Sequence, residues 1–101
     1  MPRYLSLHTL ACMTRQNAEA LVRQLSAPGA TPQGGIPPAG GGGAPVTLRR
    51  TAWSFLDGKM LAEFEAPNRE AAERWIAANA LRPEWLLRIE YESVGEEWKA
   101  L

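Results

Sequence analysis

The chain has 101 residues, which is enough for one small domain. Eleven basic residues balance eleven acidic ones, so the composition indicates neither a nucleic-acid partner nor binding to an anionic membrane. A single cysteine excludes an intrachain disulfide, and no apolar run reaches the ~20 residues that cross a bilayer. With no leader-like N-terminus, these features predict a cytoplasmic protein.

Residues 3–10 alternate loosely between apolar and polar side chains and predict a first strand. Leu5 and Leu7 fall on one face of that strand. The opposite face carries Tyr4, Ser6 and His8. Thr14 is a good N-cap for a helix that runs to about residue 25, where apolar side chains recur at helical spacing.

Residues 28–45 are a low-complexity stretch of Pro, Gly and Ala. Such a composition cannot bury enough apolar surface to offset its ordering entropy. We therefore expect a flexible loop inside the domain, and the alternative is a mobile lid over a site. The glycine run is not followed by Lys-Ser/Thr, so it does not predict a phosphate loop.

Asp57-Gly58 lies between two strand-like runs and predicts a β-hairpin. A two-residue turn places Phe55 opposite Met60, and Arg50 opposite Glu65. The face predicted to join the core carries Trp53, Phe55, Met60 and Phe64. The other face is mainly polar.

Asn68 can cap a second helix, and residues 85–92 alternate as a last strand before a short charged tail. The order strand, helix, strand, strand, helix, strand predicts one α+β domain over residues 1–101 with the ferredoxin-like βαββαβ fold. Its four-stranded antiparallel sheet has the order 4-1-3-2. Right-handed crossovers place both helices on one face.

The other sheet face is then bare. On this register it collects Tyr4, Ser6, His8, Arg50, Ser54, Leu61, Glu63, Glu65, Leu86, Arg88 and Glu90. Polar residues on central strands indicate either a solvated face or a wet cavity between two sheets. Two copies that pack sheet to sheet form a homodimeric α/β barrel around such a cavity.

The candidate catalytic residues on the bare face are His8, Glu63 and Arg88. His8 beside Glu63 can act as a general base or a metal ligand, and Arg88 can hold a carboxylate or enolate. The candidate ligand-binding residues are Tyr4, Ser6, Arg50 and Glu65. The candidate metal ligands are His8, Glu63 and Cys12. The structural alternatives are a hydrogen-bonded surface histidine, a small buried cysteine and an arginine that pairs with neighbouring glutamates.

Residues 1–5, Met-Pro-Arg-Tyr-Leu, and residues 65–71, Glu-Ala-Pro-Asn-Arg-Glu-Ala, resemble the domain of unknown function DUF4242, a family of small bacterial proteins. The resemblance covers most of the chain outside residues 26–45. It implies a ferredoxin-like dimer and a divalent metal such as nickel, although one histidine is fewer than the family's metal sites use. A similarity at the level of the fold extends to cofactor-free monooxygenases and muconolactone isomerases.

Three functions follow as hypotheses. The leading one is a protein that binds a small ligand or a metal in the polar cavity between the sheets. The second is a cofactor-free enzyme that acts on a small hydrophobic or phenolic molecule, with His8 as the base. The third is an accessory protein with no site of its own.

Overall fold

A computed structural model describes residues 1–10, 12–26 and 46–101, and the predicted loop at 28–45 lies outside them. The elements are β1 (Arg3–Thr9), α1 (Arg15–Ser26), β2 (Thr47–Ser54), β3 (Lys59–Glu65), α2 (Arg69–Ala78), β4 (Pro83–Ile89), β5 (Tyr91–Val94) and β6 (Glu97–Ala100). The predicted α+β order is confirmed as far as β4. Neither described helix is long and apolar enough to cross a membrane.

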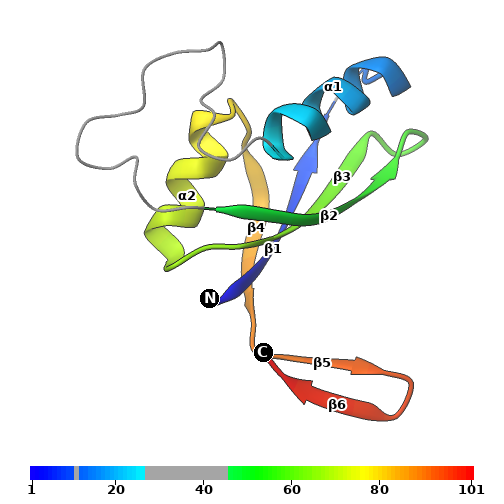
Figure 1. The fold of residues 1–101 in the computed structure, drawn as a ribbon. Coiled ribbons are helices and arrows are strands. Elements are labelled where there is room, and N and C mark those ends of the chain that lie inside the picture. Colours follow the sequence, from blue (N-terminus) through cyan, green and yellow to red (C-terminus); the bar gives the residue numbers. More distant parts are fainter. Residues whose placement is uncertain (11, 27–45) are drawn as a thin grey trace.

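The main sheet has four antiparallel strands in the order β2-β3-β1-β4, so the predicted strand order is confirmed (Figure 1). Both helices pack on the same face of this sheet, because their buried residues belong to one core with those of the strands. The arrangement is consistent with the ferredoxin-like fold. We call the face under the helices the covered face and the other the open face.

Capping side chains decide where the two helices begin. Thr14 Oγ1 accepts a hydrogen bond from the backbone N of Asn17 at 3.2 Å, and α1 starts at the next residue, Arg15. Asn68 Oδ1 accepts from the backbone N of Ala71 at 2.8 Å at the start of α2. Each cap satisfies a backbone donor that the first turn of a helix leaves unpaired. Both predicted caps are confirmed.

Phe64 on β3 is the centre of the core and is wholly buried. Its ring stacks on Tyr4 of β1 with centroids 5.9 Å apart, and it meets Trp75 of α2 at 4.7 Å. Burial of a phenylalanine side chain stabilises a fold by about 1.5–3 kcal/mol. Phe64 therefore ties α2 to both central strands. Trp53, which we predicted in the core, is half-buried at its edge.

The predicted two-residue turn of the β2–β3 hairpin is wrong. Ser54 pairs with Lys59, so the loop has four residues, 55–58. Ser54 Oγ donates to Asp57 Oδ2 at 3.1 Å and accepts from the backbone N of Asp57 at 3.3 Å, a side-chain turn that holds the longer loop. Pairing shifts by two residues, which preserves each side chain's face. Arg50 consequently lies opposite Glu63 and not Glu65.

The predicted faces of β1 and β4 are also wrong. Tyr4, Ser6 and His8 lie under the helices and are almost completely buried. Their partners across β3 are Phe64, Ala62 and Met60, which are buried core residues. Leu86 and Arg88 lie opposite Ser6 and Tyr4, so they too belong to the covered face. The residues between them therefore turn to the open face, including Leu5 and Leu7.

The residues after β4 were predicted as a strand end and a tail, but they form a second, separate sheet. β5 and β6 pair with each other and with no strand of the main sheet. Gly95 at the turn has φ +62°, a conformation that glycine adopts without strain. Figure 1 shows this hairpin standing away from the main sheet, beyond the end of β4. We call it the C-terminal hairpin.

Candidate functional site

His8 is held in the covered face by two hydrogen bonds. Its Nδ1 lies 3.1 Å from the carbonyl oxygen of Arg82, and its Nε2 lies 2.7 Å from Ser6 Oγ. A carbonyl oxygen only accepts, so Nδ1 carries the proton, and Nε2 accepts from the Ser6 hydroxyl. This hydroxyl–imidazole–carbonyl order matches an activated nucleophile. Ser6 and His8 are 0% and 1% exposed, however, so no substrate reaches them in this state.

Burial lowers the pKa of His8, and the Arg82 carbonyl and the charge of Glu84 only partly oppose this effect. The imidazole is therefore neutral at pH 7, which agrees with the donor and acceptor roles of its two nitrogens. A neutral, hydrogen-bonded pair is the form in which Ser6 and His8 can stay inside an apolar core.

His8 and Glu63 do not share a site. On β3, His8 lies opposite Met60, whereas Glu63 lies opposite Leu5 on the open face. The prediction that they share one face is therefore wrong, because β1 turns Tyr4, Ser6 and His8 toward the helices and not away from them. Arg88 lies on the covered face opposite Tyr4, four residues from His8 along β1, or about 13 Å at ~3.3 Å per residue. The structure does not bring the three candidate catalytic residues together.

The other sequence-predicted residues divide between the two faces. Tyr4 and Ser6 are core residues. Arg50 and Glu65 lie at one end of the open face, and Cys12 is exposed beyond β1 with φ +58°. Within the described ranges, no three His, Cys, Asp or Glu side chains gather as a metal site would require. His8, Glu63 and Cys12 therefore do not form a ligand set in this structure.

One end of the open face holds a cluster of charges. Arg3 Nη1 lies 3.4 Å from Glu63 Oε2, and Arg50 Nε lies 3.1 Å from Glu63 Oε1. Arg3 also reaches Glu92 of the C-terminal hairpin at 3.3 Å. The Arg3 and Glu63 side chains are only 14% exposed, so their attraction is less screened than that of a surface pair. Arg3 was missed, although it alternates with Leu5 and Leu7.

The opposite end of the open face holds a second polar cluster. Lys59 Nζ donates to Glu84 Oε1 and to Thr9 Oγ1, both at 2.7 Å, and Thr9 Oγ1 donates to the same carboxylate at 2.7 Å. The hydrogen bonds from Lys59 and Thr9 lower the pKa of Glu84. None of these residues was predicted as functional, because the irregular β1–β4 pairing near His8 cannot be read from the sequence.

Between the two clusters the open face is apolar. Leu7 lies opposite Trp85 on one side and Leu61 on the other, and Leu5 lies opposite Leu87. Trp85 and Leu87 are 38% and 50% exposed. The open face is therefore an aliphatic and aromatic surface with an ionic cluster at each end, and not the polar surface that the sequence predicted.

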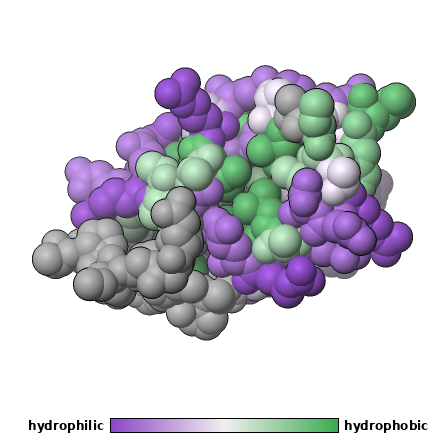
Figure 2. Space-filling model, turned by 90° about the horizontal axis from the view of Figure 1, so that it is seen from above, coloured by the Kyte–Doolittle hydropathy of each residue, from purple (hydrophilic) through white to green (hydrophobic). Residues whose placement is uncertain are grey.

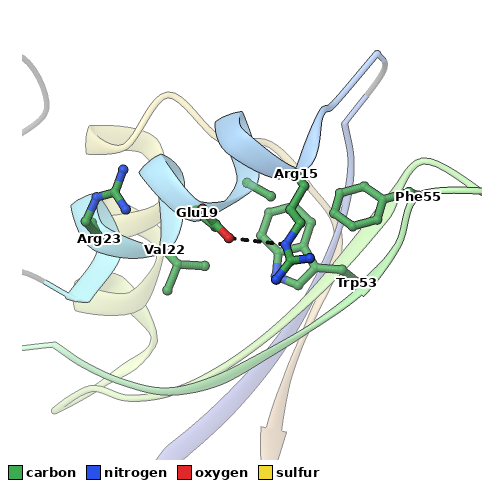
Figure 3. Close-up of a pocket in the computed structure, with 7 residues that line it drawn as sticks. Arg15, Glu19, Val22, Arg23, Trp53 and Phe55 are labelled. Atoms are coloured by element: carbon green, nitrogen blue, oxygen red, sulfur yellow. Dashed lines mark hydrogen bonds and ion pairs between the residues drawn. The ribbon is translucent and has the colours of Figure 1, made fainter.

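A separate groove lies between α1 and the end of β2 and has a volume of about 520 Å³. Trp53 and Phe55 form one wall, with stacked rings 5.9 Å apart, and Ala18 and Val22 of α1 form another (Figure 3). Arg15, Glu19 and Arg23 complete the lining, and Arg15 Nε pairs with Glu19 Oε1 at 3.2 Å. Figure 2, a view from the α1 side, shows apolar surface in a hollow between hydrophilic side chains. Such a groove offers flat apolar contact beside cations.

Comparison of the chain with protein-family models, with curated proteins and with solved structures finds no match in any of the three. The chemistry of the chain must therefore be inferred from its own surfaces. Among the described residues, the open face and the α1–β2 groove each combine apolar surface with charged side chains.

We expect the protein to lose stability as the pH falls below about 6.5, the ordinary pKa of histidine. Between the pKa of His8 in the unfolded chain and its lower pKa in the folded protein, only the unfolded chain binds the proton. The free energy of unfolding therefore falls by at most about 1.4 kcal/mol per pH unit in this range, and it falls no further below the folded-state pKa. Urea unfolding between pH 5 and 8 measures how the free energy of unfolding depends on pH. In His8→Gln this dependence should be weaker.

An NMR titration of His8, the only histidine, is the control. Its pKa should lie below 6.5, should fall further in Glu84→Gln, which removes a charge that acts on His8, and should be unchanged in Glu63→Gln, because Glu63 lies opposite Leu5, three residues from His8 along β1. A shift in Glu63→Gln as large as that in Glu84→Gln would contradict this placement of Glu63.

Proposed function

We propose that the protein is a homodimer of ferredoxin-like subunits whose open faces pack together and hold a small, mainly apolar molecule between them. The observation that carries this proposal is the apolar centre of the open face, around Leu7, Trp85 and Leu87. Soluble proteins seldom leave a contiguous surface of this kind uncovered. A second copy of the chain is the occupant that we propose.

The charges at the two ends of the open face favour a second copy as the partner. Each cluster holds both signs, with Arg3, Arg50 and Glu63 at one end and Lys59 and Glu84 at the other. An interface between identical surfaces must be complementary to itself. A rim of mixed sign meets that condition, whereas a rim of one sign would repel its own copy.

The ligand that fits this cavity is flat or aliphatic and carries few polar groups. The half-buried leucines Leu5, Leu7 and Leu61 offer apolar contact, and the nearest polar groups are the two end clusters, whose charges pair within each cluster while Arg3 Nε is buried without a hydrogen-bond partner. This departs from the polar or metal-containing cavity expected from the sequence. A cytoplasmic location and a relation to DUF4242 remain parts of the proposal, and the exposed Cys12 thiol suits a reducing compartment.

Leu87→Glu is expected to convert the dimer into a folded monomer. A carboxylate at this position would be buried opposite the partner's apolar face, and an unpaired buried charge costs several kcal/mol. Light scattering should give about 11.1 kDa for this variant and about twice that mass for the unmodified chain. The matched control is Leu56→Glu in the β2–β3 loop, where Leu56 is 96% exposed. A dimer that survives Leu87→Glu would contradict the proposed interface.

The dimer should bind 1-naphthol, a flat and mainly apolar probe, with saturable heat by isothermal titration calorimetry. Since the cavity exists only between two sheets, Leu87→Glu should abolish this binding and Leu56→Glu should retain it. Phe55→Ser, which removes one wall of the α1–β2 groove, should also retain it. Binding that survives Leu87→Glu and disappears in Phe55→Ser would assign the probe to the groove and refute the inter-sheet site.

A further inference from the structure

The C-terminal hairpin has one apolar face and one charged face. Its register pairs Tyr91 with Ala100 and Ser93 with Trp98, and these four residues share a face. The opposite face carries Glu92, Val94, Glu97 and Lys99. Tyr91 and Trp98 are 61% and 76% exposed. The largest apolar side chains of the hairpin therefore point into solvent in the single chain.

The hairpin contacts the main sheet through Glu92, which lies on its charged face. Glu92 pairs with Arg3 at 3.3 Å, and the backbone N of Leu101 donates to the carbonyl of Glu90 at 2.9 Å, which closes the base of the hairpin. A hairpin that served its own domain would turn its apolar face inward and its charges to water. An isolated two-stranded hairpin is also only marginally stable. The orientation observed suits a hairpin whose apolar face packs on another molecule.

The apolar surface of β4 leads directly into this hairpin. Trp85, Leu87 and Ile89 alternate along the open face of β4, and Tyr91 is the next residue in the same alternation. Figure 1 shows the hairpin beyond the end of the main sheet. The hairpin therefore projects farther than the edge of the chain's own open face. A partner that covers that face lies within its reach.

The size of the open face gives a second reason. Four strands of seven or eight residues have a flat footprint of roughly 450 Å² at about 4.8 Å between strands and about 3.3 Å per residue. Standard interfaces bury about 800 Å² on each partner. The sheet alone makes a small interface. Tyrosine and tryptophan side chains, at ~150–250 Å² each, are large enough to extend it.

We propose that the C-terminal hairpin is a dimerisation arm, which lays the face of Tyr91 and Trp98 on the second copy of this chain at the rim of the open face. The inference rests on the proposed homodimer and names a further part of its interface. By two-fold symmetry each subunit gives one arm and receives one. The two arms close opposite ends of the cavity between the sheets.

Trp98→Ser tests the arm against Val94→Ser, a matched control on the charged face of the same hairpin, where Val94 is 75% exposed. Sedimentation equilibrium over a dilution series measures the dimer dissociation constant. We expect Trp98→Ser to raise it at least tenfold and Val94→Ser to change it less than threefold. Trp98 is exposed in the single chain, so its loss should leave monomer unfolding unchanged, which urea titration in the Leu87→Glu background measures.

The outcomes separate the arm from the proposed function. If the unmodified chain dimerises and Trp98→Ser and Val94→Ser both leave the dissociation constant unchanged, the arm is refuted and the interface of open faces stands. If Trp98→Ser disrupts a dimer that Leu87→Glu leaves intact, the hairpin still joins two copies, but the interface of open faces and the cavity between the sheets are refuted. A chain that remains monomeric at every concentration refutes both.

Discussion

The alternation of side chains along β1 determines which residues lie at the centre of each face of the main sheet. β1 is a central strand, so its side chains fill the middle of both faces. Tyr4, Ser6 and His8 point under the helices, which leaves Leu5 and Leu7 for the open face. A one-residue change of register would exchange the two sets completely. The apolar character of the open face is thus a direct consequence of which residues of β1 enter the core.

A polar pair can occupy the core because it is satisfied there. Ser6, His8 and the Arg82 carbonyl form a closed chain of hydrogen bonds, while Tyr4 stacks on Phe64. Burying Ser6 and His8 without partners would cost several kcal/mol, but hydrogen bonding removes most of that penalty. Leucines on the outer face of the same strand are then best explained as part of a second apolar interface, which the proposed second copy would complete.

Local signals predicted much of the fold, and the failures have physical causes. The caps at Thr14 and Asn68 depend on neighbouring backbone groups, and the element order determined the sheet topology. Alternation shows that side chains divide between two faces, but tertiary contacts decide which set faces the helices. The sequence analysis placed Leu5 and Leu7 of β1 under the helices, and the structure places Tyr4, Ser6 and His8 there. The four-residue loop depends on a side-chain turn at Ser54, and the C-terminal hairpin lacks a strong turn dipeptide. The predicted His8–Glu63 site was wrong for the same reason, because His8 and Glu63 lie on different faces of the sheet.

A dipolar distance measurement between spin labels at Cys12 tests the central claim most directly. Cys12 is exposed and is the only cysteine, so each subunit of the unmodified protein takes one nitroxide label. A dimer of facing sheets should give a single intermolecular distance between two spins, and Leu87→Glu should abolish it. Absence of any dipolar coupling in the unmodified protein, or a distance that persists in Leu87→Glu, would contradict the claim that a second copy covers the open face.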